Sequence, residues 1–428
     1  MEEKIHIYSD ESNHDKSITY KENNINIDNE DLSREYVRSY LVINTSRLYD
    51  VESELNNLEK RYFSFRKDEP KGKIIFQLSK KVGLKNLSEE ATKYLIDLLD
   101  IIEGFEIKMF LVIFNKIEYI VNNSIEVDIA RFSKKYRSIN DDREIRYSFS
   151  KYFGNHYNER FRGAFFARKD SNTDYKIKKA INEMNSQLKK YKLKRSEYLV
   201  GKNLCSLIDN GIVKFNTKGS YKWDYNFESN AIINILEQIH KEKITISFDK
   251  GTRVSAVFKE QLISRNIENI EVTPDKESKE DVLIRLSDYF ATFFGKLSRS
   301  YSNSFKLIDL KTGEKNYSTV ETIPESWFDL TEIQFHLAKK IGDLIKKESI
   351  IFLHGFLADT PIGLKNYFQF ISDFKEFSDF QAVDNVKLSQ LNNQRLSETW
   401  YTSHSEQGVF FSPYDATYGA LSENFGKS

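Results

Sequence analysis

Short runs of β-branched and aromatic residues alternate with amphipathic helical stretches along much of this chain. The β-prone runs cover residues 5–9, 36–44, 107–114, 244–248 and 267–273. The helical stretches cover residues 50–61, 88–103, 229–242, 252–264, 281–297 and 331–347. Strands that alternate with helices of this length predict an α/β protein.

The composition is that of a chain which can bury a core, since 39% of its 428 residues are hydrophobic and 30% are charged. Cys205 is the sole cysteine, which excludes an intrachain disulfide and a zinc site built from cysteines. The charged N-terminus lacks the apolar core of a signal peptide, and no apolar stretch is long enough to span a membrane. We therefore expect a cytoplasmic protein with no membrane partner.

Residues 131–202 carry 20 Lys and Arg against 8 Asp and Glu, with aromatic residues interleaved. Basic side chains neutralise phosphates and aromatic rings stack on bases, so this region is a candidate nucleic-acid interface, for RNA or DNA. Its candidate contact residues are Lys134, Lys135, Arg137, Lys178, Lys179, Lys189 and Lys190. The alternative is a solvated helical hairpin whose aromatic residues form its own core.

An apolar seam runs along part of this basic region. Ile177, Ile181, Met184, Leu188 and Tyr191 follow one another at spacings of four and three residues. That spacing predicts a helix over residues 176–195 with a narrow apolar stripe. The stripe offers an interface for a homodimer or for a protein partner.

Three carboxylates occupy positions that need a polar neighbour. Two β-prone runs end in Asp10-Glu11 and in Asp249, and Asp288 lies within an otherwise apolar helical stretch. Open α/β sheets place their chemistry at the carboxyl ends of strands, and a lone buried carboxylate is costly. Carboxylates that face one another favour a cation between them, and hard oxygen ligands suit Mg²⁺ or Mn²⁺. The alternative for such residues is a turn or helix cap, which is our interpretation of Asp281.

Several separated stretches of the chain resemble motifs of a large, mostly uncharacterised bacterial family with a ribonuclease H-like fold. The segment Tyr8-Ser9-Asp10-Glu11-Ser12-Asn13 is similar to the family's Tyr-x-Asp-Glu-Ser-Gly opening, and Glu69-Pro70-Lys71-Gly72 matches its Glu-x-Lys-Gly motif. Phe248-Asp249, then Ser278-Lys279, then Arg285-Leu286-Ser287-Asp288 follow in the family's order. The resemblance covers residues 4–115 and 243–297, and it departs from the pattern at Asn13, Arg285 and Ser287.

The resemblance implies a mixed five-stranded sheet with helices on both faces and the first strand at its centre. The core would comprise residues 1–120 and 243–300, with a basic, mainly helical insertion over 121–242 and an additional α/β accessory region over 301–428. The implied site has Asp10, Glu69, Asp249 and Asp288 as catalytic ligands of one or two Mg²⁺ or Mn²⁺ ions. Around them, Glu11 would orient a ligand or accept a proton, and Lys71 would hold a phosphate or neutralise charge. Apart from the resemblance, His14 follows the carboxylate turn and is a candidate proton carrier, the alternative being a polar loop histidine.

The combined expectation is a metal-dependent nuclease that hydrolyses nucleic-acid phosphodiesters, and the same resemblance suggests antiphage defence or a mobile element. Two alternatives from other classes stay open. One is a nucleic-acid-binding or assembly subunit with a vestigial carboxylate cluster, and the other is a structural protein whose basic helix binds an acidic partner. Metal-dependent cleavage that is lost in Asp10→Ala and Asp249→Ala separates the enzyme from both.

Overall fold

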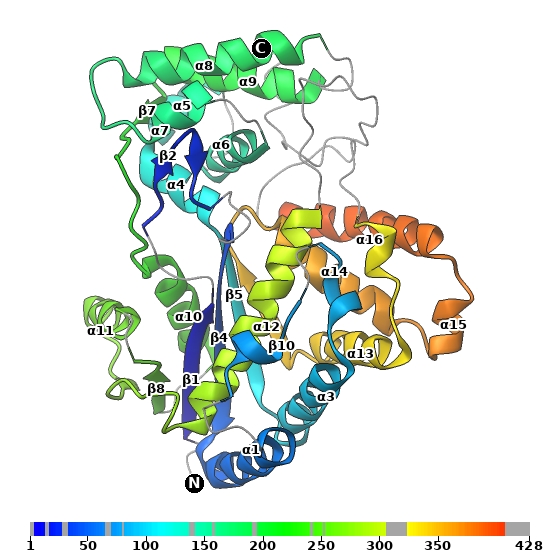
Figure 1. The fold of residues 1–428 in the computed structure, drawn as a ribbon. Helices are drawn as coiled ribbons and strands as arrows, with labels where there is room; N and C mark the ends of the chain where they lie inside the picture. Colours follow the sequence, from blue (N-terminus) through cyan, green and yellow to red (C-terminus); the bar gives the residue numbers. More distant parts are fainter. Residues whose placement is uncertain are drawn as a thin grey trace.

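The computed structural model describes residues 4–12, 17–27, 33–64, 70–78, 81–136, 142–155, 159–190, 195–239, 243–250, 253–304 and 323–406. Two hydrophobic cores lie on opposite faces of one central sheet. Figure 1 shows this sheet between two layers of helices, with a further group of helices beyond one end of the strands. Within the described residues, no helix is both long and apolar enough to cross a membrane.

The central sheet is mixed and has six strands, in the order β10-β5-β4-β1-β8-β9. The strands are β1 (Ile5–Ser12), β4 (Glu35–Asn44), β5 (Lys108–Asn115), β8 (Ile244–Phe248), β9 (Ile270–Val272) and β10 (Ile350–His354). Strand β4 runs antiparallel to β1 and β5, whereas the pairs β1–β8, β8–β9 and β5–β10 are parallel. The α/β prediction is therefore confirmed, and β1 is an internal strand.

The C-terminal region corrects the predicted number of strands in the sheet. It supplies β10, which pairs with β5 and gives the sheet six strands where five were predicted. Its helices α13 (Glu332–Lys346) and α14 (Asp359–Ser372) contribute buried residues to the same core as β4 and β5. The described part of residues 301–428 therefore adds an edge strand to the central sheet and packs on one of its faces. The region also contains η4 (Glu325–Trp327), α15 (Phe377–Gln381) and α16 (Asn385–Glu406).

One face of the sheet is covered by α1 (Leu48–Phe63), α3 (Glu89–Gly104) and α12 (Val282–Ser304), together with α13 and α14. Helix α3 begins after Ser88, whose side chain accepts a hydrogen bond from the Ala91 N–H. Helix α12 begins after Asp281, whose Oδ1 accepts from the N–H groups of Leu283 and Ile284. The interpretation of Asp281 as a helix cap is thus confirmed. The short elements η1 (Thr45–Arg47), α2 (Gly72–Ile75) and η2 (Gly83–Asn86) connect these helices.

The other face of the sheet is covered by α10 (Asn226–Ile239) and α11 (Val254–Ser264). The inserted region precedes α10 and contributes buried residues to the same core. Its helices are α4 (Lys116–Ser124), α5 (Ile129–Tyr136), α6 (Arg143–Asn155), α7 (Glu159–Phe165), α8 (Thr173–Leu188) and α9 (Arg195–Asp209). The insertion also contains a small antiparallel ladder of β6 (Ile125–Val127) with β7 (Val213–Phe215). A second ladder, β2 (Tyr20–Lys21) with β3 (Asn24–Ile25), comes from the segment between β1 and β4 and contacts the insertion through the Ile18–Tyr221 bridge.

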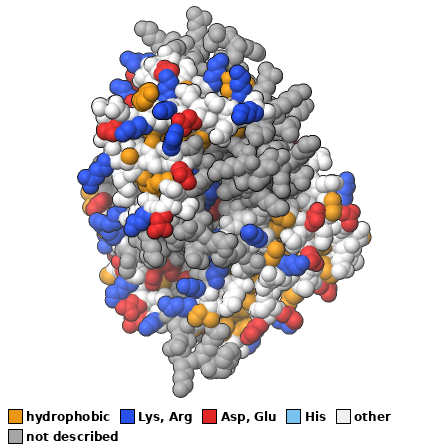
Figure 2. Space-filling view, turned by 45° about the horizontal axis from the view of Figure 1, so that its top comes forward, with side chains coloured by type: hydrophobic (Ala, Val, Ile, Leu, Met, Phe, Trp, Pro, Cys, Tyr) orange, Lys and Arg blue, Asp and Glu red, His pale blue; other side chains and the backbone are white. Residues whose placement is uncertain are grey.

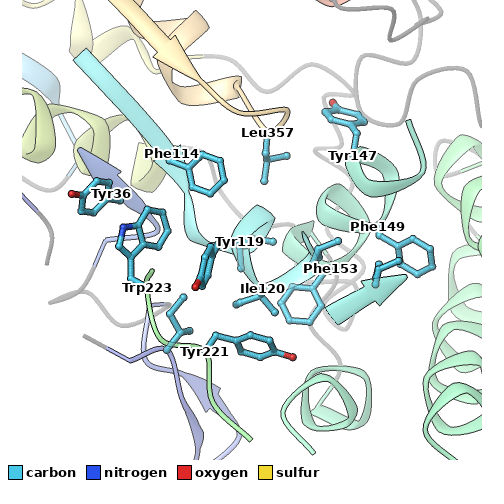
Figure 3. Close-up of a cluster of buried hydrophobic side chains, with 14 of the residues drawn as sticks. Tyr36, Phe114, Tyr119, Ile120, Tyr147, Phe149, Phe153, Tyr221, Trp223 and Leu357 are labelled. Carbon is cyan, nitrogen blue, oxygen red and sulfur yellow. The ribbon is translucent and has the colours of Figure 1, made fainter. Parts of the chain in front are cut away.

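Buried aromatic rings join the insertion to the sheet (Figure 3). The Trp223 ring lies 4.7 Å from Tyr36 on β4, 5.5 Å from Phe114 on β5 and 4.7 Å from Tyr119 on α4, measured between ring centroids. Further inside the insertion, the buried rings are those of Tyr147, Phe149, Tyr152, Phe153, Phe161 and Phe165. These rings pack the region against the sheet and against itself, so they are core residues and are not available to stack on bases.

Candidate carboxylate site

Asp10 and Asp249 lie side by side at the carboxyl ends of two neighbouring parallel strands. Ser9 on β1 pairs with Phe248 on β8, and the Asp249 N–H donates to the Ser9 carbonyl oxygen at 3.1 Å. The next residue of each strand is the aspartate, so the two backbones at this point are about 5 Å apart. Because register partners in a sheet point to the same face, both side chains lie on the face that α12 covers. The prediction that these strand ends meet is confirmed.

Helix α12 brings Asp288 to the same place. The preceding residue, Ser287, is hydrogen-bonded to Ser39, with 2.6 Å between the two hydroxyl oxygens. Ser39 is the β4 partner of Asp10 in the sheet register, so this contact fixes α12 over Asp10. The Asp288 carboxylate accepts the Gly72 N–H on Oδ2 at 3.1 Å and the Thr292 hydroxyl on Oδ1 at 2.9 Å.

The three carboxylates act on one another electrostatically. Asp10 is 9% exposed, and burial raises the pKa of its carboxyl well above the usual value; the negative charges of Asp288 and Asp249 raise it further. Burial also raises the pKa of Asp249, and Asp288 contributes again. Lys71 lowers the pKa of both Asp10 and Asp249. Four charged groups from four segments of the chain therefore share one region, and its three carboxylates outnumber the cations that act on Asp10, Arg38 and Lys71.

The chemistry of these donors fits a divalent cation, because carboxylate oxygens in excess of nearby positive charge are what Mg²⁺ and Mn²⁺ prefer. Their geometry fits it less well. No group of three or more His, Cys, Asp or Glu side chains among the described residues is arranged so that it could hold a metal ion. Two of the predicted site residues, Glu69 and His14, lie outside the described residues. The four-carboxylate ligand set accordingly stays a prediction.

Lys71 and Gly72 reach the site because α2 lies directly against α12. Lys71 is the residue that precedes α2, and Gly72 is the first residue of that helix. A Cβ atom at Gly72 would lie 3.0 Å from the Cβ of Thr292 and 3.3 Å from the Asp288 Oδ2. Glycine is therefore needed here for a close approach, and the approach is what allows the Gly72 N–H to bind Asp288. The position predicted for Lys71, beside the carboxylates, agrees with its effect on their pKa values.

Glu11 does not join the cluster. Successive residues of a strand point to opposite faces, and Glu11 points away from Asp10 into the other core. There its carboxylate forms an ion pair with Arg38 and accepts a hydrogen bond from the Tyr36 hydroxyl at 3.1 Å. The predicted role of Glu11, to orient a ligand or accept a proton beside Asp10, is thus corrected to that of a buried ion-pair partner.

Arg38 and Glu228 belong to this second network, and the sequence analysis missed both. Arg38 is 1% exposed, and its Nε donates to the Glu228 Oε1 at 3.1 Å. Burial raises the pKa of Glu228 to about 7, although Arg38 and the Tyr36 hydroxyl act in the opposite direction. Arg38 also lowers the pKa of Asp10 from the other side of the sheet. An arginine inside the apolar run 36–44 was the available signal, since such a cation needs a buried acidic partner.

The predicted nucleic-acid contacts are only partly described. The side chains of Lys134 and Lys135 and the whole of Arg137 lie outside the described part. Lys178 forms an ion pair with Asp209, whereas Lys179, Lys189 and Lys190 are exposed. Figure 2 shows Lys and Arg side chains interspersed with Asp and Glu over the insertion, with no continuous basic patch among the described residues on that face.

The apolar stripe of the basic helix is filled from within the chain. Helix α8 ends at Leu188, short of the predicted residue 195, and it packs against α7 and α9. Ile177, Ile181 and Leu188 are 0% exposed and Met184 is 4% exposed. The predicted homodimer or partner interface through this stripe is therefore wrong, because the stripe is part of the insertion's own core.

The fold and the site together define an α/β protein with a mixed six-stranded sheet and an acidic cluster at the ends of two parallel strands. Comparison with known proteins finds no matching protein-family model, no matching curated protein and no matching solved structure. The function has to be argued from the site itself.

Proposed function

We propose that this protein is a metal-dependent nuclease with a ribonuclease H-like core, which hydrolyses phosphodiester bonds of RNA or DNA. Support for the core comes from five of the strands, β5-β4-β1-β8-β9, which form a mixed sheet with β1 at its centre and helices on both faces. This is the arrangement that the sequence motifs imply. Strand β10 is then an addition at the β5 edge.

One observation carries the functional proposal. The contacts of β8 and α12 with the strands around Asp10 bring Asp249 and Asp288 to it from two other segments of the chain, and burial, then the charges of Asp288 and Asp249, raise the pKa of Asp10. Packing of three acidic side chains without an equal number of cations is unfavourable in the absence of a ligand. Strongly perturbed carboxylates at the carboxyl ends of parallel strands are typical of catalytic sites.

In this proposal the residues of the site have separate roles. Asp10, Asp249 and Asp288 provide oxygen ligands, and Gly72 and Thr292 orient Asp288 through the two hydrogen bonds to its carboxylate. A divalent cation bound there would lower the pKa of a water molecule and stabilise the leaving oxygen of a phosphodiester. Lys71, whose charge acts on both Asp10 and Asp249, is the candidate to pair with a substrate phosphate.

The test is cleavage of fluorescently labelled RNA and DNA, single- and double-stranded, with Mn²⁺, with Mg²⁺ and with EDTA. We expect cleavage only with a divalent cation, and its loss in Asp10→Asn and in Asp249→Asn while both variants still bind the substrate. Asp329→Asn is the matched control, because Asp329 is an exposed aspartate paired with Lys85 outside the cluster. Cleavage that survives both site substitutions would refute the proposal.

The second candidate is a nucleic-acid-binding or assembly subunit with a vestigial carboxylate cluster. It is favoured by the lack of a three-ligand arrangement among the described residues. Its signature in the same experiment is salt-dependent binding of nucleic acid by the wild type with no cleavage under any metal condition.

A further inference from the structure

Helix α12 does more than carry Asp288, because one side of it also fastens the segment over residues 70–76. The Tyr289 hydroxyl donates to the Glu59 Oε1 at 2.7 Å and also lies 3.1 Å from the Pro70 carbonyl oxygen, at the start of this segment. At its end, the Lys296 ammonium donates to the carbonyl oxygens of Lys73 and Phe76 at 2.8 and 2.6 Å. Between them, Thr292 is in close contact with Gly72.

The three side chains Tyr289, Thr292 and Lys296 lie three and four residues apart, so they occupy one stripe of the helix. We call them the α12 clamp. The segment they hold contains only four helical residues, and an isolated helix of that length is not stable in water. Its position therefore depends on contacts with its surroundings, among which the clamp binds backbone groups at both ends.

The clamp is connected to the acidic cluster through the segment. Gly72 donates its N–H to Asp288, and Lys71 acts on the pKa of Asp10 and of Asp249. Lys296 is itself within electrostatic reach of the cluster: burial and Lys73 lower its pKa, while Asp288 raises it. Movement of the segment would thus change both the orientation of Asp288 and the position of Lys71 relative to Asp10 and Asp249.

We propose that Lys296 and Tyr289 are positioning residues, which hold residues 70–76 so that Gly72 orients Asp288 and Lys71 faces the acidic cluster. This inference rests on the proposed metal-dependent function. It assigns to the clamp a role in the affinity of the site for a divalent cation, since the hydrogen-bond partners of metal ligands tune that affinity.

The experiment compares Lys296→Met with Lys339→Met in the full-length protein. Lys339 is the matched control, because it is also half-buried and also donates to two backbone carbonyl oxygens, those of Ser372 and Phe374, at the end of α14. Methionine keeps the apolar stem of either lysine and removes its charge and its donors. The readouts are Mn²⁺ affinity from water-proton relaxation and amide hydrogen exchange of residues 70–76.

We expect Lys296→Met to weaken Mn²⁺ binding about tenfold and to accelerate exchange in residues 70–76, while Lys339→Met changes neither. Tyr289→Phe should act in the same direction, with Tyr367→Phe as its control, since Tyr367 is buried and donates to the Trp327 carbonyl oxygen. Unchanged exchange in Lys296→Met would show that the clamp does not hold the segment.

Two other outcomes separate this inference from the function on which it rests. Faster exchange with unchanged Mn²⁺ affinity would make the clamp a purely structural contact and would overturn the inference alone. A wild-type protein that takes up no Mn²⁺ would overturn the proposed function, and the positioning role would fall with it.

Discussion

Removal of the Asp10 charge should make the metal-free protein more stable, which is unusual for a substitution at a buried polar residue. In the folded protein the pKa of Asp10 is raised by burial and by two neighbouring carboxylates. The folded state then binds the proton more tightly than the unfolded state, so the unfolding free energy falls as pH rises from the unfolded pKa through the folded one. Asp10→Asn removes this loss and keeps the oxygen that accepts the Glu11 N–H.

The size of the effect follows from the spacing of the strands. Two unit charges about 5 Å apart repel by about 3 kcal/mol at an effective dielectric constant of about 20. Lys71 and Arg38 offset part of this repulsion. We therefore expect Asp10→Asn to raise the unfolding free energy by about 1–3 kcal/mol at pH 8, and the difference to shrink towards pH 4, where the wild-type carboxyl is protonated.

The assay is denaturation by urea in EDTA at several pH values, followed by tryptophan fluorescence, which reports on the buried Trp223 and Trp327. Glu11→Gln is the control on the opposite face of the same strand. It removes one partner of the buried ion pair with Arg38 and should lower stability. A metal-free Asp10→Asn protein that is less stable than the wild type at pH 8 would refute the argument that Asp10 carries uncompensated charge. A stability difference that does not depend on pH would refute it as well.

Three further substitutions test neighbouring parts of the structure. Arg38→Met leaves the buried Glu228 without its cation, so we expect a loss of about 3–5 kcal/mol in the unfolding free energy, measured by urea denaturation at pH 8. Glu118 is buried against the Leu357 N–H, and burial raises its pKa from 4.5 to about 7. Wild-type stability should thus fall between these pH values, and Glu118→Gln should remove about 3 kcal/mol of that fall in a pH series of denaturation curves. Gly72→Ala places a methyl group against α12 and should cost about 1–3 kcal/mol; a thermal melt no lower than that of the wild type would contradict the close approach.

Much of the central sheet could be predicted because its signals are local. The runs that became β1, β4, β5 and β8 are short, β-branched and bounded by polar residues, and each was predicted within a few residues of its observed ends. Strand β10 could not be assigned to this sheet in the same way. Its pairing with β5 joins segments far apart in the sequence, and an edge strand with half-buried residues has no local feature that names its partner.

The helical periodicity of α8 shows the same limit. The spacing of Ile177, Ile181 and Met184 predicted a helix with an apolar stripe, and both are present. The spacing of apolar residues shows that the stripe must be buried, but it does not show which segment or molecule buries it. Helices α7 and α9 of the same chain bury the stripe, so the predicted interface with another molecule was wrong. From the sequence alone, burial within the chain and burial by another molecule were physically equivalent.

The meeting of the three aspartates could be predicted in part, because it follows from the positions of strand ends and from a charged residue within an apolar helix. Asp10 and Asp249 were expected to meet because both end strands of one sheet, and Asp288 because a carboxylate in an apolar helix needs a polar neighbour. The face to which Glu11 points depended on the register of β1, which the sequence leaves open by one residue. A shift of one residue in this register would move Glu11 from the core on the opposite face into the acidic cluster.

Buried charged side chains are balanced differently on the two faces of β1. This contrast is the strongest argument for a functional site on one of the faces. On one face Arg38 lies between Glu11 and Glu228, so each buried charge contacts one of opposite sign. On the other face Asp10 lies near Asp249 and Asp288, and the cations that act on it, Lys71 and Arg38, lower its pKa without cancelling the rise. In the first arrangement both carboxylates share a direct ionic contact with Arg38. Stability alone does not account for the second, since any apolar residue in place of Asp10 would avoid the repulsion. A cost of this kind is characteristic of sites where a bound ligand recovers it. A ligand that recovered this cost would carry positive charge, and the preference of carboxylate oxygens for divalent cations is why we propose a metal-dependent function.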